Sequence, residues 1–191
     1  MLNAFLSFRR CTSISNLPAR ATLGALLFTL LAVSAPAAAQ PTIAADAEYA
    51  LPLDEEFDSG ASFGARVGHQ FDGPSAAITP ELGFNYTSFS GDLAPKLYRG
   101  MAGARFGVGK VVRPGAFAHA GFGHVQLDAV SGSGDASYTR FTFDAGAFLD
   151  FTLVPYVIFG AHLAYNRIAA SDDFQALRWA TFGAHAAVVF E

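Results

Sequence analysis

The chain has 191 residues, 52% of them hydrophobic and 15% charged, and its formal net charge is −4. An acidic chain without a basic cluster is not expected to bind nucleic acid. Its single cysteine excludes a disulfide-stapled scaffold, and its 19 glycines argue against a helix bundle, because glycine weakens helix interiors.

The N-terminal segment, residues 1–39, has the organisation of a secretory signal peptide. An uncharged apolar run, residues 21–33, lies between a basic region and the small residues that precede Gln40. The run is shorter than the ~20 residues that a membrane-spanning helix needs. The arginines of the basic region are Arg9, Arg10 and Arg20. Cleavage would leave residues 40–191 as one domain without cysteine, with nine basic and sixteen acidic residues and a formal charge of −7.

Eight segments with a period of two occupy the rest of the chain. In each segment, apolar side chains alternate with small, polar or charged ones, which predicts β-strands with two different faces. In chain order, we expect strands at residues 42–51, 61–71, 76–89, 96–109, 115–127, 138–151, 155–166 and 179–190. These segments are longer than the usual globular strand and suit tilted strands that cross an apolar band ~25 Å tall.

The segments between the predicted strands alternate in length. Short connectors follow the second, fourth and sixth strands, whereas the other connectors are longer and richer in Asp, Ser and Gly. Outer-membrane barrels have this arrangement, with short periplasmic turns and longer external loops. The predicted external loops are residues 52–60, 89–95, 128–137 and 167–176.

Glycine indicates which face of the strands points inward. Ten glycines share the parity that carries the charged residues, and glycine leaves room in the crowded interior of a small barrel. They are Gly64, Gly68, Gly83, Gly103, Gly107, Gly121, Gly123, Gly146, Gly160 and Gly183. We therefore assign the charged parity to the lumen and the apolar parity to lipid. The opposite assignment, a soluble periplasmic barrel with an apolar interior, is the alternative.

Four stretches resemble the outer membrane protein beta-barrel domain family, small porin-like proteins similar in shape to the OmpA membrane domain and OmpX. They are Pro80-Glu81-Leu82-Gly83-Phe84-Asn85-Tyr86, residues 113–123 with Gly121-Phe122-Gly123, residues 143–150 and residues 182–190. The resemblance covers essentially all of residues 40–191. It implies an all-β, eight-stranded antiparallel up-and-down transmembrane β-barrel in the outer membrane of a Gram-negative-type cell.

The resemblance also implies the partners of the chain. The last strand, with Phe182, Val188 and Phe190 on its apolar parity, would carry the C-terminal signal for barrel assembly. We expect contact with the barrel assembly machinery and periplasmic chaperones during biogenesis, and with outer-membrane lipid and lipopolysaccharide afterwards. We expect a monomer that holds no cofactor and binds no nucleic acid.

Seven ionisable residues fall on the inward parity. They are Glu48, Arg66, Glu81, Arg99, Arg105, Asp144 and Asp150. Unpaired charges in a narrow lumen are costly, so acids and bases should pair there. We interpret the set as a structural ion-pair network that fills the lumen. The alternative is a narrow channel for ions or small solutes, and which acid pairs with which base is left open.

Three histidines, His119, His162 and His185, also fall on the inward parity. Neighbouring inward imidazoles could share a metal ion. No closely spaced His/Cys motif accompanies them, so we expect polar filling of the lumen and no metal. His69 and His124 lie near strand ends and are expected at the membrane interface.

An enzymatic role has little support in the sequence. Some eight-stranded outer-membrane barrels modify lipid A with a Ser and a His at the lipid-facing rim, and such a site needs a nucleophile and a base in contact. No His-x-Ser pair occurs on a predicted strand, and Asp58-Ser59 is a common turn dipeptide. We therefore expect a structural or surface-interaction role, with a lipid A-modifying enzyme as the remote alternative.

Aromatic residues gather near the ends of the predicted strands. They are Tyr49, Tyr86, Tyr98, Tyr138, Tyr165 and Trp179, together with Phe89 and Phe151. Tyr and Trp are enriched where a membrane meets water. We expect these side chains to form interfacial girdles that anchor the barrel.

Overall fold

The computed structural model describes residues 39–54, 58–91, 95–127, 136–154, 156–171 and 175–190. Apart from Ala39, the predicted signal peptide lies outside the described residues. No helix in this part of the chain is long and apolar enough to cross a membrane.

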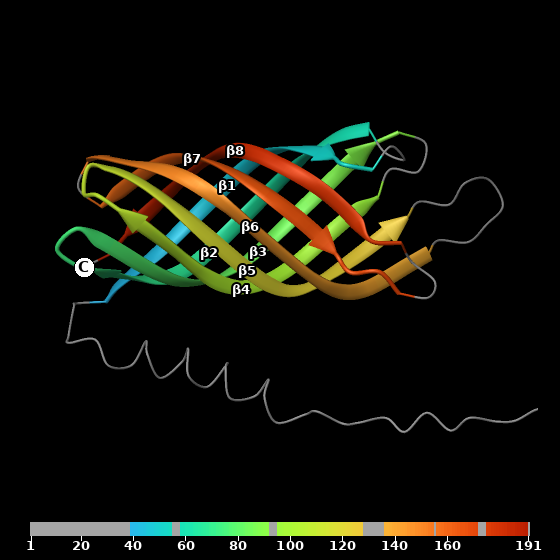
Figure 1. The fold of residues 1–191 in the computed structure, drawn as a ribbon, viewed down its shortest axis with the longest axis horizontal. Helices are drawn as coiled ribbons and strands as arrows, with labels where there is room; N and C mark the ends of the chain where they lie inside the picture. Colours follow the sequence, from blue (N-terminus) through green and yellow to red (C-terminus); the bar gives the residue numbers. More distant parts are fainter. Residues whose placement is uncertain are drawn as a thin grey trace, which may run out of the picture. The chain divides into compact units, whose positions relative to one another are not determined.

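Eight antiparallel strands form one closed barrel (Figure 1). The strands are β1 (Gln40–Pro52), β2 (Asp58–Asp72), β3 (Ala76–Ser90), β4 (Lys96–Val108), β5 (Val112–Leu127), β6 (Ala136–Val154), β7 (Val157–Ile168) and β8 (Leu177–Val189). Each strand pairs with the next one along the chain, and β1 closes the barrel by pairing with β8. The predicted fold class and strand order are therefore confirmed.

The observed strands extend beyond several of the predicted bounds. The extensions at the start of β2, the start of β5 and the end of β6 are three residues each, and the one in β5 crosses a segment where the sequence predicted a turn through Pro114. Instead, Val112 pairs with Phe151 and Pro114 with Leu149, so the ladder with β6 begins before the proline. Proline has no backbone N–H to donate, but its carbonyl oxygen can still accept a hydrogen bond. The residues before and after Pro114 pair with the long strand β6 in the same register.

The exterior of the barrel is apolar, and the lumen is polar. Large hydrophobic side chains of the outward parity are about half exposed or more, for example Phe63 (57%), Leu82 (61%) and Phe122 (67%). Arginine, carboxylate, histidine and amide side chains of the other parity are buried inside. This distribution is the reverse of a soluble barrel and matches a barrel surrounded by lipid.

The two ends of the barrel differ. Residues 73–75 and 109–111 form short connectors at one end, which we call the short-turn end, where β1 begins and β8 ends (Figure 1). The strand ends that the longer connectors join are at the opposite end, which we call the long-loop end, and this alternation is the one that the sequence predicted. At the short-turn end, Gly109 adopts a φ of 113° and donates its backbone N–H to Ser75 O at 2.9 Å. Glycine suits that position because L side chains rarely adopt such a φ.

Inward apolar side chains gather in the lumen at the long-loop end. This outer plug consists of Ala50, Phe89, Leu97, Val125, Ile168, Leu177 and Trp179. Trp179 is 0% exposed and lies edge-on to Phe89, with ring centroids 6.1 Å apart. The prediction that Trp179 and Phe89 belong to the interfacial girdle is therefore wrong. Trp179 shares the parity of Thr181 and Gly183, and this parity, which points inward, outweighs its position near the strand end.

Replacement of Gly121 by Ala tests the close approach of β4 and β5. A Cβ at Gly121 would lie 2.0 Å from the backbone oxygen of Gly100, which only a strand displacement can relieve. Such overpacking costs about 1–3 kcal/mol. The matched control is Gly100→Ala, because a Cβ at Gly100 meets no atom within 4 Å. We expect G121A, but not G100A, to lower the temperature at which the folded band is lost in gels of unboiled samples; equal loss in both would contradict the register.

Candidate functional site

The lumen is crossed by a chain of ion pairs that begins on β1. Arg66 donates from Nε and Nη2 to Asp46 Oδ2 and Oδ1, at 2.9 and 2.8 Å. Its Nη1 donates to Glu81 Oε1 and Oε2 at 3.0 and 2.9 Å. The three side chains are at most 12% exposed. One guanidinium on β2 thus neutralises carboxylates from both neighbouring strands, in the planar geometry that arginine favours.

His119 continues the chain across the barrel. Its Nε2 lies 2.8 Å from Glu81 Oε1 and its Nδ1 lies 2.7 Å from Asp144 Oδ1. A carboxylate accepts hydrogen bonds only, so both ring nitrogens carry a proton and the imidazole is charged. His119 is therefore a cation that joins two acids on opposite sides of it.

Arg99 links this chain to the outer plug. Its guanidinium lies 3.7 Å from Asp144 Oδ2 and donates to Asn166 Oδ1 at 2.7 Å and to Asn85 Oδ1 at 2.8 Å. The guanidinium carbon also lies 4.8 Å from the centroid of the Trp179 ring, in cation–π contact. The side chain is buried, and the two amides satisfy donors that a single acid would leave free.

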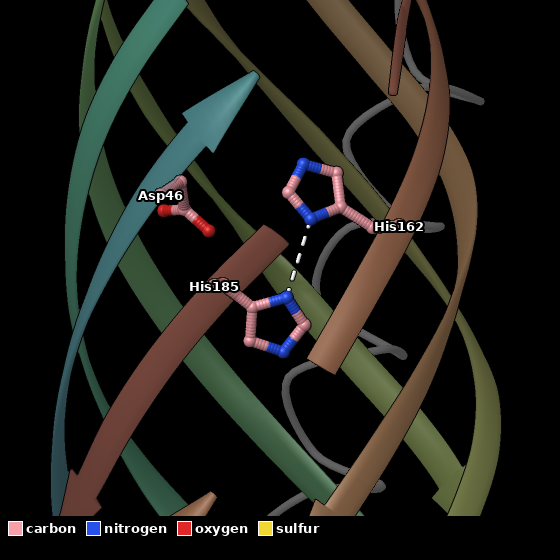
Figure 2. Close-up of side chains that lie close together, drawn as sticks. All are labelled: Asp46, His162 and His185. Atoms are coloured by element: carbon pink, nitrogen blue, oxygen red, sulfur yellow. Dashed lines mark hydrogen bonds between the residues drawn. The ribbon is translucent and has the colours of Figure 1, made fainter. Parts of the chain in front are cut away.

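A second cluster lies beside the first, on β1, β4, β6, β7 and β8. His185 Nε2 is 2.8 Å from Asp150 Oδ1, which also accepts from Arg105 Nη2 at 3.2 Å. His162 Nε2 is 2.8 Å from Glu48 Oε1. The Nδ1 atoms of His162 and His185 face each other at 3.2 Å (Figure 2).

Two cavities connect the second cluster to the short-turn end. A cavity of about 250 Å³ at this end is lined in part by Gln70, Asp72 and Arg113. A smaller one, of about 40 Å³, shares Gln70 and Arg113 and reaches Arg105 and His185 deeper in the barrel. Such a volume admits water-sized species. The polar lumen is therefore reachable from the short-turn end, whereas the outer plug covers the other end.

The structure places all seven predicted lumen residues inside and brings each into contact with a partner of opposite charge or a histidine. The contacts join Glu48, Arg66, Glu81, Arg99, Arg105, Asp144 and Asp150 to the three inward histidines and to one another. Sequence reasoning left Asp46 and Arg113 out of this set. The inward parity of β1 was the signal for Asp46, whereas the predicted turn through Pro114 concealed that Arg113 points inward.

Tyr49, Tyr86, Tyr98 and Tyr165, four of the predicted girdle tyrosines, lie on the outside, near the long-loop end. Tyr49 is 44% exposed and packs on Phe182, with ring centroids 5.3 Å apart. Tyr86 and Tyr98 face each other across β3 and β4 at 5.1 Å, and Tyr165 is 38% exposed. The girdle prediction is wrong for Tyr138 at the start of β6, which is the direct cross-strand partner of the plug residue Val125 and therefore shares its inward parity. The Arg140 guanidinium carbon lies 5.8 Å from its ring centroid.

One ion pair lies at the solvent-exposed rim. Arg178 donates to both carboxylate oxygens of Asp54. This hydrogen bonding holds the pKa of Asp54 below its ordinary value. Of the two predicted interfacial histidines, His69 is exposed, and His124 Nδ1 lies 3.0 Å from Thr139 Oγ1 on the neighbouring strand.

No family model and no curated protein matches the chain in sequence. Solved structures do match. Neisserial surface protein A (NspA) superposes with a TM-score of 0.59 at 19% identity, over 78% of this chain and 96% of that one. The chain has the fold of the small eight-stranded outer-membrane β-barrels. Ail, the attachment invasion locus protein of Yersinia pestis, matches with a TM-score of 0.55 at 17% identity, over 80% of this chain and 99% of that one. The outer membrane protein OprG from Pseudomonas aeruginosa matches with a TM-score of 0.53 at 10% identity, over 81% of this chain and 97% of that one.

The energetic importance of the network in this outer-membrane-type barrel is testable at Arg66. Arg66→Met leaves Asp46 and Glu81 buried without their guanidinium, and breaking a buried pair in this way costs about 3–5 kcal/mol. Trp179 is the single tryptophan and is buried, so its fluorescence reports unfolding in urea. We expect a lower free energy of unfolding for R66M.

The control for this measurement is Arg178→Met, which removes an arginine that also pairs with an aspartate, but at the exposed rim. Exposed pairs contribute little to stability. We expect R178M to unfold at the same urea concentration as the unmodified protein. Equal stability of all three proteins would show that the lumen network is energetically unimportant.

Proposed function

We propose that the chain is an integral outer-membrane protein of a Gram-negative-type cell with a structural or surface-interaction role and a lumen that does not conduct. The observation that carries the proposal is that two barriers in series occupy the lumen: the outer plug and the chain of ion pairs beneath it. The exterior supplies the lipid contact, and the long-loop end supplies the surface that faces outward.

The dense packing of the described residues of the outer plug supports a lumen that is blocked at the long-loop end. Leu97, Val125, Ile168 and Trp179 are each 0% exposed. Arg99 lies directly beneath Trp179 and is held by amides and an acid. An ion that passed through would have to displace an apolar cluster and then a buried guanidinium, which is unfavourable in both steps.

The ion pairs beneath the plug link strands on different sides of the barrel. Arg66 holds β1 to β3 through Asp46 and Glu81, and His119 extends the contact to Asp144 on β6. In a channel, lining charges remain hydrated and face an open path. Here they neutralise one another at short distances, which supports a filling, structural role over the narrow-channel alternative.

The membrane partners follow from the exterior. Tyrosines at the long-loop end would anchor the barrel among lipopolysaccharide headgroups, and the apolar band would contact acyl chains. Phe182, Val188 and Phe190 are 49%, 42% and 45% exposed on one face of the last strand. We assign to this face the assembly signal that the barrel assembly machinery and periplasmic chaperones would read, and we assign the folded protein a monomeric state.

Planar-bilayer recording separates the structural role from a channel. We expect the purified, heat-modifiable protein to give no discrete conductance steps under conditions in which a general porin, prepared in the same detergent, does. Discrete steps that change in amplitude in Arg66→Ala or Arg105→Ala would contradict the proposal and favour the narrow channel.

An enzymatic alternative rests on one specific contact. His124 and Thr139 are direct cross-strand partners near the long-loop end, with Nδ1 3.0 Å from Oγ1. The other ring nitrogen of His124, Nε2, lies 3.5 Å from the Gln126 amide nitrogen. A triad base is normally oriented by a carboxylate, so the hydroxyl lacks the usual activation.

Mass spectra of lipid A test this alternative. We expect identical lipid A from cells with and without the gene. A mass change that Thr139→Val and His124→Gln each abolish, while the folded band stays in the outer membrane, would establish an enzyme and reject a purely structural role.

A further inference from the structure

Three buried side chains from three adjacent strands converge in the lumen. Asp46 on β1 is the direct cross-strand partner of His185 on β8, and His162 comes from β7, which pairs with β8. Each offers one ligand atom, and these atoms all lie within 4.8 Å of one another (Figure 2). Their side chains are only 2–6% exposed. We call this group the lumen cluster.

The hydrogen bonds of the two histidines determine where their protons lie. Nε2 of His162 faces Glu48 Oε1 at 2.8 Å, and Nε2 of His185 faces Asp150 Oδ1 at 2.8 Å. Carboxylates only accept, so each Nε2 carries a proton. In the neutral imidazoles, both Nδ1 atoms then present lone pairs to each other at 3.2 Å. Two facing lone pairs repel unless a cation lies between them.

The neighbouring guanidiniums do not supply the cation that the two facing Nδ1 lone pairs need between them. Arg105 Nη2 lies 3.3 Å from His185 Nε2, but both groups donate to the same oxygen of Asp150, so the contact is one side of a triangle. Arg66 binds both oxygens of Asp46. An ionised carboxylate has about four lone-pair sites, so Asp46 can still offer one to a cation.

The charge balance of the central lumen also favours one more cation. Among the described residues that these ion pairs join in the central lumen, five carboxylates meet three guanidiniums and the doubly donating His119, which leaves one negative charge in excess; Arg113 pairs separately with Asp72. The carboxylates are Asp46, Glu48, Glu81, Asp144 and Asp150. In addition, Glu48 Oε2 is buried and has no hydrogen-bond partner in the described part of the chain.

We propose that the lumen cluster binds a divalent transition-metal ion, with zinc as its first choice. Nδ1 of His162, Nδ1 of His185 and a carboxylate oxygen of Asp46 are the ligands, and water completes the set. With Zn–N bonds of ~2.0–2.1 Å, tetrahedral geometry separates two nitrogens by about 3.3 Å, close to the 3.2 Å observed. The ligand atoms of the three residues lie up to 4.8 Å apart, so the Asp46 carboxylate would have to move toward the two Nδ1 atoms to reach bonding distance.

Glu48 and Asp150 give the cluster an outer shell. A metal-bound histidine usually donates its other N–H to a carboxylate, which fixes the ring and increases its basicity. Both histidines of the lumen cluster have such a partner at 2.8 Å. By contrast, both ring nitrogens of His119 donate to carboxylates, so neither has a lone pair for a metal ion.

Access to the lumen cluster is from the short-turn end. The cavity that begins at Gln70 and Arg113 reaches His185, and a second cavity of about 40 Å³ is lined by Asp46, Glu48 and His162. The ion would thus come from the periplasmic side, and the outer plug would separate it from the exterior.

Zinc binding to the full-length, detergent-purified protein tests the proposal. After treatment with a chelator and dialysis, we expect the folded protein to retain one equivalent of added Zn²⁺, measured by elemental analysis. His162→Gln and His185→Gln should each weaken binding at least about tenfold, and Glu48→Gln about 10–100-fold without changing the stoichiometry. His124→Gln, at the outer rim, is the matched control and should bind as the unmodified protein does.

A measurement on the unmodified protein covers the case in which the histidine variants fail to fold. Co²⁺ should replace Zn²⁺ and give the visible absorption of a tetrahedral nitrogen- and oxygen-ligated site. Absence of retained Zn²⁺ and of this absorption would show that the two Nδ1 atoms share only a proton, and would overturn the proposal. So would zinc binding that persists in a folded H162Q/H185Q variant. Neither outcome bears on whether the lumen conducts.

Discussion

Satisfaction of backbone hydrogen bonds in lipid is the constraint on which the rest of this structure depends. The hydrocarbon region offers no water to a free strand edge, so a sheet can exist there only if it closes. Pairing of β1 with β8 removes both edges. Eight strands enclose a space just wide enough for side chains, and the polar parity of every strand therefore meets inside a narrow lumen.

That narrow space explains the pairing of charges in the lumen. A carboxylate or guanidinium taken out of water is stable only when a partner neutralises it and its remaining donors and acceptors are satisfied. Arg66 meets this condition between Asp46 and Glu81. Arg99 meets it in part: it pairs with Asp144, donates from Nη1 and Nη2 to two amides and lies against an aromatic face, while its Nε has no hydrogen-bond partner among the described residues. The polar network fills the interior of this barrel and links its strands, a role that apolar side chains have in a soluble barrel.

The three inward histidines show how the same residue type acquires different chemistry. His119 lies between two carboxylates and is held as a cation. His162 and His185 each donate one proton to a carboxylate and turn the other nitrogen toward each other. The difference comes from which strands lie side by side after closure, because the partners are as far apart in sequence as Glu48 and His162.

The period of two determined the strands and their two different faces, since it depends only on local spacing. The glycines on the charged parity assigned that face to the lumen, and the lengths of the connectors distinguished the two ends of the barrel. The assignment to the lumen also placed all seven predicted charges inside. Three features required the tertiary structure: which acid meets which base, the inward turn of Trp179 into the outer plug, and the convergence of Asp46, His162 and His185. Pairing across a closed barrel depends on register and on the β1–β8 contact, and these long-range relations leave no periodic signal in the chain.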